Sequence, residues 1–237
     1  MTDTITAAEP AVVDTELKRT ARTTGALYLA FFVAGILGTF VIRGQLFVDG
    51  DPAATLSNLT RLEGLARLGI ALELAIVVAQ ALTALWFYRL FRGVDRVAAA
   101  ALVLFGMAGA TAILGSAALL ATAHEVAADT SLATGVGAAG TVQLLYVASG
   151  HVWGVAAVFF GLWLIPMGWQ VLRSRWQPKA LGWILILAGF GYVLSAFAAY
   201  LLPDTGLSQL LTLPSIVGEV WIMGYLLTVG IAHRHGR

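Results

Sequence analysis

Cysteine is absent from this sequence of 237 residues. Its absence excludes disulfides, thiolate metal sites and cysteine nucleophiles. Charged residues are also scarce: they make up 11% of the chain, against about 25% in a typical soluble domain. A net charge of +1 gives no reason to expect a nucleic-acid partner. Together with a mean hydropathy of +0.86, these deficits indicate an integral membrane protein whose main partner is the lipid bilayer.

Long apolar runs alternate with short polar segments and predict an all-α integral membrane bundle of six transmembrane helices. We expect the spans at about 25–42, 68–88, 97–121, 145–172, 181–202 and 215–232. They form one membrane domain over residues 24–232, between a disordered cytoplasmic tail over 1–23 and a short cytoplasmic tail over 233–237. No secretory h-region or cleavage site precedes the first apolar run, so we expect that run to be an uncleaved first span.

The stretch from Gln143 to Lys179 is the most informative of these runs, because it is long enough to cross a hydrocarbon layer of roughly 30 Å. His151 is the one ionisable group inside its apolar part. Gly150, Gly154 and Gly161 recur at helical spacing, and small residues on one face allow another helix to approach closely. We therefore expect this span to pack tightly against a neighbour.

The distribution of basic residues predicts the orientation in the membrane. Eleven of the fourteen Lys and Arg residues fall on one side of the predicted spans, and Arg43, Arg61 and Arg67 fall on the other. The side richer in Lys and Arg normally faces the cytoplasm. Both termini are therefore expected to be cytoplasmic, with the connection between spans 1 and 2 outside.

This first outer connection carries a helix-start signal. Asp51 offers a side-chain acceptor at the N-cap, and Pro52 has the fixed φ that suits the first helical position. Leu56, Leu59 and Leu62 then recur on one face. The pattern predicts a short amphipathic helix over about 51–62, which lies on the outer surface or caps the bundle.

Three ionisable residues lie inside the predicted spans, where burial in hydrocarbon is costly and a function is the first hypothesis. Glu73, His151 and Glu219 each follow the outer boundary of their span by five or six residues, which places them at roughly the same depth of 8–9 Å. We expect them to form one polar layer in the outer third of the bilayer. Arg67, at the outer end of span 2, is the expected counter-charge.

Further polar residues could join this layer from nearby segments. Arg43 and Asp51 lie on the covering loop, and His124 and Glu125 lie at the outer end of span 3. Gln80 is seven residues from Glu73 and therefore on nearly the same helix face. These five are secondary candidates.

Three functional classes fit this pattern. The first, which we favour, is an outward-facing site that binds or transports a small solute or ion. The second is an intramembrane metal-dependent hydrolase with zinc held by His124, His151 and a Glu, although no HExxH spacing supports it. In the third, the protein is a structural or complex-forming membrane protein, and its buried carboxylates only hold helices together. The sequence assigns no catalytic residue, metal ligand, cofactor or oligomeric state.

Five stretches resemble one family in their order along the chain: ARTTGALYLAFF, RGQLFVDGDPAATLSN, ARLGIALEL, RSRWQPKALGWILILAGFGY and GEVWIMGYLLTVG. Together they are similar to the domain-of-unknown-function 4386 family (DUF4386) of prokaryotic multi-span membrane proteins, over about residues 19–231. The resemblance implies a multi-pass protein of the prokaryotic cell membrane, and it supplies no catalytic residues.

Overall fold

Six long helices and one short capping helix form the computed structural model, which describes residues 9–135 and 137–231. The first span is α1 (Glu9–Ile36), continued by the π-helix η1 (Leu37–Arg43) and the single turn α2 (Gly44–Leu46). The others are α4 (Glu63–Phe91), α5 (Arg96–Ala128), α6 (Ala138–Arg173), α7 (Lys179–Leu201) and α8 (Leu207–Thr228). All six are long and apolar enough to cross a membrane, which confirms the predicted fold class.

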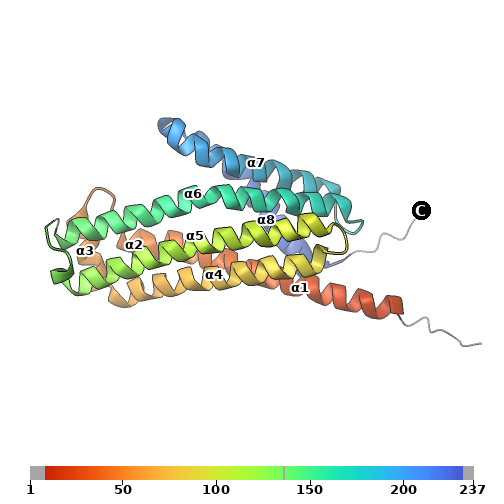
Figure 1. Ribbon diagram of the computed structural model, residues 1–237, viewed down its shortest axis with the longest axis horizontal. Coiled ribbons are helices and arrows are strands. Elements are labelled where there is room, and N and C mark those ends of the chain that lie inside the picture. Colours follow the sequence, from red (N-terminus) through yellow and green to blue (C-terminus); the bar gives the residue numbers. More distant parts are fainter. Residues whose placement is uncertain (1–8, 136, 232–237) are drawn as a thin grey trace, which may run out of the picture.

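The six helices close into a ring. Each of α4 to α7 packs against the next long helix in the chain, and α1 completes the ring by packing against both α4 and α8. Figure 1 shows the start of α1 and the α4–α5 and α6–α7 connections at one end, with α3 and the α5–α6 connection at the other. These ends match the two sides that the charge distribution separates.

The predicted capping helix is present as α3 (Pro52–Arg61). Asp51 is its N-cap, and its carboxylate accepts a hydrogen bond of 2.9 Å from the Ala54 N–H, as the Asp-Pro pair predicts. The buried side chain of Leu59 and the Thr55 hydroxyl face inwards. Thr55 donates to Gln143 of α6 at 2.8 Å, so α3 closes one end of the ring rather than lying free on the surface.

Several helices extend further than the apolar runs predict. α1 begins at Glu9, inside the segment 1–23 that we expected to be disordered; residues 1–8 lie outside the described residues. α6 begins at Ala138 instead of about 145, and α8 begins at Leu207 instead of about 215. An apolar run marks only the part of a helix that lies in hydrocarbon, and backbone hydrogen bonding continues beyond it. In α8, Pro214 lies within the helix and does not begin it.

Glycines set the distance between α6 and α7. A Cβ on Gly161 would lie 2.5 Å from the carbonyl oxygen of Gly189, and a Cβ on Gly168 would lie 2.5 Å from that of Gly182. Backbones this close leave no room for a side chain. The small-residue face predicted on this span is therefore a packing face where it includes Gly161.

Two smaller elements, η2 (Thr130–Leu132) and η3 (Pro203–Thr205), lie in connections.

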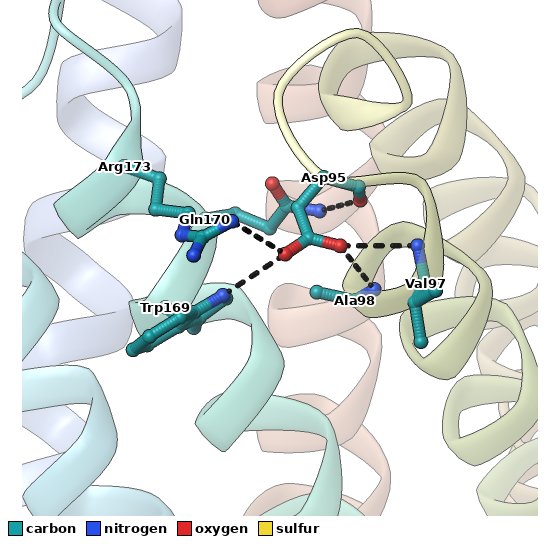
Figure 2. A network of polar contacts seen from close by, with 6 residues as sticks. All are labelled: Asp95, Val97, Ala98, Trp169, Gln170 and Arg173. Atoms are coloured by element: carbon teal, nitrogen blue, oxygen red, sulfur yellow. Dashed lines mark hydrogen bonds and ion pairs between the residues drawn. The ribbon is translucent and has the colours of Figure 1, made fainter.

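At the opposite end from α3, Asp95 joins the α4–α5 connection to α6 (Figure 2). One carboxylate oxygen accepts from the Val97 and Ala98 N–H groups, both at 3.1 Å. The other accepts from Trp169 at 3.1 Å and pairs with Arg173 at 3.2 Å. This residue therefore caps α5 and fixes its start against the end of α6.

Candidate functional site

The π-helix η1 brings a charged residue into the ring. π-helical turns are rare in proteins overall, and those that occur are frequently found at functional sites. Here the π-helix ends at Arg43, which is half-buried and reaches across to α6. No pattern in the sequence predicts this local change of helix type.

Arg43 is held by three kinds of contact with neighbouring residues. Its Nη1 donates to the Ser149 hydroxyl at 3.1 Å, and its Nη2 donates to the Tyr146 carbonyl at 2.6 Å. The guanidinium carbon lies 5.2 Å from the ring centre of Phe47 and 5.4 Å from that of Tyr146, within cation–π range. Gly150 leaves space for it, since a Cβ there would lie 3.1 Å from Nη2. None of these partners is an anion.

Glu73 lies on α4, across from α6, and its side chain is buried. One carboxylate oxygen accepts a hydrogen bond of 3.0 Å from the Trp153 indole N–H. The other, Oε2, is buried and makes no hydrogen bond of acceptable geometry among the described residues, although the Ser116 hydroxyl lies close enough to the carboxylate to interact with it. Leaving a buried carboxylate oxygen unpaired is costly, so this atom is a place where a ligand or water would be stabilised.

Arg43 and Glu73 line the same cavity, which has a volume of about 230 Å³. Tyr146, Gly150 and Trp153 of α6 form another wall. In the part of the chain that the structure describes, Arg43 forms no ion pair; the two pairs found there are Arg67–Glu63 and Arg173–Asp95. A cation and a carboxylate thus face one small space without neutralising each other directly.

The helix register places this cavity near one end of the bundle. Glu73 lies eighteen residues before the end of α4 at Phe91, a distance of about 27 Å at 1.5 Å per residue. A hydrocarbon core is about 30 Å thick. The cavity is therefore close to the end of the bundle that α3 caps.

Glu219 belongs to a different site. It accepts a hydrogen bond of 2.8 Å from the Tyr28 hydroxyl of α1, and it lines a second cavity that does not include Glu73. It is nine residues from the end of α8 at Thr228, about 14 Å and so near the middle of this helix. The expected depth was counted from Pro214 as the start of the span, whereas α8 begins at Leu207, twelve residues before Glu219.

His151 and Arg67 do not join either carboxylate. The His151 side chain is exposed, with Nδ1 3.2 Å from the Tyr200 hydroxyl of α7. Arg67 is exposed and pairs with Glu63 one turn before it, while its Nε lies 3.4 Å from His124. The expected single layer of Glu73, His151, Glu219 and Arg67 is therefore not what the structure shows. A shared depth does not fix which face of each helix points inwards.

The secondary candidates also separate. Arg43 joins Glu73, whereas Asp51 caps α3 and Glu125 is exposed. Gln80 is buried in α4, and its amide has no hydrogen-bond partner among the described residues. Its amide nitrogen lies close to Gly109 of α5, since a Cβ at that position would be only 2.8 Å from it.

The ligand set of the hydrolase alternative is not assembled. His124 contacts Arg67, and His151 contacts Tyr200. Over residues 9–135 and 137–231, no group of three His, Asp or Glu side chains is arranged to hold a metal ion.

Sequence reasoning missed the aromatic and hydroxyl donors that hold the charged groups. Trp153, Tyr28 and Ser149 had no signal of their own, because aromatic and small residues are common throughout these spans. The position of Trp153 was a usable signal. Because it follows His151 by two residues, it faces a different side of α6 from His151.

Comparison with protein families matches residues 23–230 to the family described as "Domain of unknown function (DUF4386)". The chain belongs to this family. The match covers all six spans of this DUF4386 protein except the start of the first and confirms the resemblance of the five stretches. Comparisons with curated proteins and with solved structures return no match.

Proposed function

We propose that this DUF4386 protein binds a small solute in the cavity between Arg43 and Glu73, as a binding or transport protein of the membrane. The observation that carries the proposal is that, among the described residues, Arg43 forms no ion pair and Glu73 Oε2 forms no hydrogen bond, although both side chains line one cavity. A bound solute would supply an anion to Arg43 and a hydrogen-bond donor to Glu73.

Arg43 selects the anionic part of the solute. An Arg side chain carries five N–H donors and stays charged in proteins. The contacts to Ser149 and Tyr146 leave donors free, and neither contact compensates the charge. The planar guanidinium binds a carboxylate, or another small oxyanion, best, because two parallel N–H groups can donate to two oxygens.

Glu73 selects a hydrogen-bond donor. Its Oε2 would accept from an ammonium or N–H group, while Trp153 holds the other oxygen in place. A solute with both features is a small zwitterion, such as an amino acid. A cavity of about 230 Å³ suits a molecule of that size better than a drug-sized one.

The charge distribution supports an outward-facing site. The cavity lies towards the α3 end, which carries Arg43, Arg61 and Arg67, and the other end carries the greater number of basic residues. With both termini in the cytoplasm of a prokaryotic cell, the cavity receives its solute from outside.

Three small probes separate these requirements in one experiment. Glycine is a zwitterion, acetate supplies only the anion and methylamine only the cation. We expect glycine to raise the unfolding temperature of the purified protein most, acetate less, and methylamine not at all. A ligand at one hundred times its Kd stabilises by about 2.7 kcal/mol.

Arg43→Gln removes the charge and should abolish the shifts with glycine and acetate. Arg67→Gln is the matched control, because Arg67 lies outside the cavity in an exposed pair with Glu63. Equal shifts in both variants would show that the anion binds elsewhere. No shift with any probe, together with a clear loss of stability in Arg43→Gln, would favour the structural role instead.

A further inference from the structure

The second cavity has a different chemistry from the first. It measures about 550 Å³, within the range of small-molecule sites, and is lined mainly by aromatic and aliphatic side chains of α1, α6 and α8. Among the described residues that line it, Glu219 is the one charged side chain. Thr212 and Ser215 lie on the same face of α8, and Tyr192 of α7 adds a further hydroxyl.

Its aromatic rings form a connected wall. The Phe160 ring lies 6.5 Å from that of Phe31 and 6.3 Å from that of Tyr192, and Phe31 meets Trp163 edge-on at 6.2 Å. A cation bound against such faces is attracted by the ring quadrupoles, as in the aromatic cages that hold ammonium groups.

Glu219 supplies the matching charge. Within the described part of the chain, only Tyr28 donates a hydrogen bond to it. A carboxylate with one neutral donor near the middle of the membrane remains poorly compensated. A cation in the cavity would compensate it, and no basic side chain lines the cavity to compete.

The mouth of this cavity opens sideways. Phe40 is 76% exposed, and Ile216 and Val220 are at least half-exposed. In a bundle of six membrane spans, large apolar side chains exposed on helix surfaces face lipid. A ligand would therefore enter from the hydrocarbon and must itself dissolve there.

We propose that the cavity beside Glu219 binds a lipophilic organic cation that enters from the bilayer. The positive group lies between Glu219 and the aromatic wall, and the apolar part fills the remaining space. This site is separate from the Arg43–Glu73 cavity, and it does not depend on the function proposed there.

Tetraphenylphosphonium and tetraphenylborate test the charge requirement, because the two ions have nearly the same shape and opposite charge. Equilibrium dialysis with the purified full-length protein would measure both affinities. We expect the cation to bind at least ten times more tightly than the anion. Glu219→Gln should weaken cation binding at least tenfold and leave the anion unaffected. Glu125→Gln, which removes an exposed carboxylate that lines neither cavity, is the control that should retain wild-type binding of both ions.

Gly35→Leu tests the place independently of the charge. Gly35 lines the cavity, and a Cβ there meets no atom within 4 Å, so the variant should fold and fill the site. Gly115→Leu, which also points into open space but lines neither cavity, is its control. Loss of cation binding in Gly35→Leu alone supports the proposal. Wild-type binding in Gly35→Leu, or equal affinity for both ions, would overturn it and indicate partitioning by hydrophobicity only.

Discussion

Each carboxylate inside the bundle is held by one aromatic donor. Trp153 donates to Glu73, and Tyr28 donates to Glu219. Tyr and Trp suit this position because each combines a large apolar surface with one polar group. They hold a carboxylate without adding a second charge to the membrane interior.

Tyr28→Phe removes only the hydroxyl that donates to Glu219. Because it leaves a buried carboxylate oxygen without a donor, we expect a loss of about 1–3 kcal/mol in the free energy of unfolding. Tyr200→Phe is the matched control, since Tyr200 is 52% exposed where it meets His151. It should cost less than about 0.5 kcal/mol. Unfolding in mixed micelles with increasing denaturing detergent would measure both, and equal losses would contradict this role of Tyr28.

At the opposite end from α3, the Asp95 contacts should make stability depend on pH. The hydrogen bond from the Ala98 N–H and then that from Trp169 lower the pKa of the Asp95 carboxyl from its ordinary value, and Arg173 adds to this. A lowered pKa stabilises the fold above the ordinary value, and this contribution is lost as the pH falls through the pKa of the folded state. Asp95→Asn should thus destabilise most at neutral pH.

The difference between wild type and Asp95→Asn should shrink as the pH falls below about 4. Asn keeps a side-chain oxygen that can cap α5, but its amide nitrogen cannot accept from Trp169, so the change of the difference with pH, and not its size, reports the charge (Figure 2). Thermal unfolding of both proteins at several pH values measures it. A difference that stays constant with pH would show that the charge of Asp95 adds no stability.

At the scale of the helices, the sequence predicted elements better than their contacts. The Asp51–Pro52 pair located α3 because a cap and a fixed φ are local properties. The start of α8 was predicted eight residues late because Pro214, taken as a boundary, lies inside the helix. The π-helix that ends at Arg43 had no local signal. The cavity that Arg43 and Glu73 share depends on this turn and on the packing of the ring, which brings together residues far apart in the chain.

Gly161→Ala tests the close approach of α6 and α7. Its Cβ would lie 2.5 Å from the Gly189 carbonyl oxygen and 2.8 Å from the Val193 nitrogen, so the two helices must separate. Overpacking of this kind costs about 1–3 kcal/mol. Gly115→Ala, whose Cβ meets nothing within 4 Å, should be neutral or slightly stabilising. The same detergent unfolding assay compares them, and equal stabilities would mean that the helices are less closely packed than described.

At the scale of the whole molecule, a closed ring of six helices encloses two cavities of different character. Trp153 and Thr39 line both cavities, so the two are neighbours. The smaller holds Arg43 and Glu73 near the α3 end, and the larger holds Glu219 at mid-depth. We propose that the smaller cavity is open to water on the outside and attracts anions.

The absence of cysteine permits a direct test of that claim, because any introduced thiol is the only one. Leu120→Cys places a thiol in the wall of the smaller cavity, and Thr134→Cys places one on the exposed α5–α6 connection. The measurement is the rate at which each reacts, in intact cells, with an anionic and with a cationic methanethiosulfonate of similar size. Both positions should react, since the distribution of basic residues predicts that this end of the bundle faces outwards. At Leu120→Cys alone, the anionic reagent should react relatively faster, and Arg43→Gln should remove that preference. No reaction at Leu120→Cys, or a preference that Arg43→Gln leaves unchanged, would contradict the account.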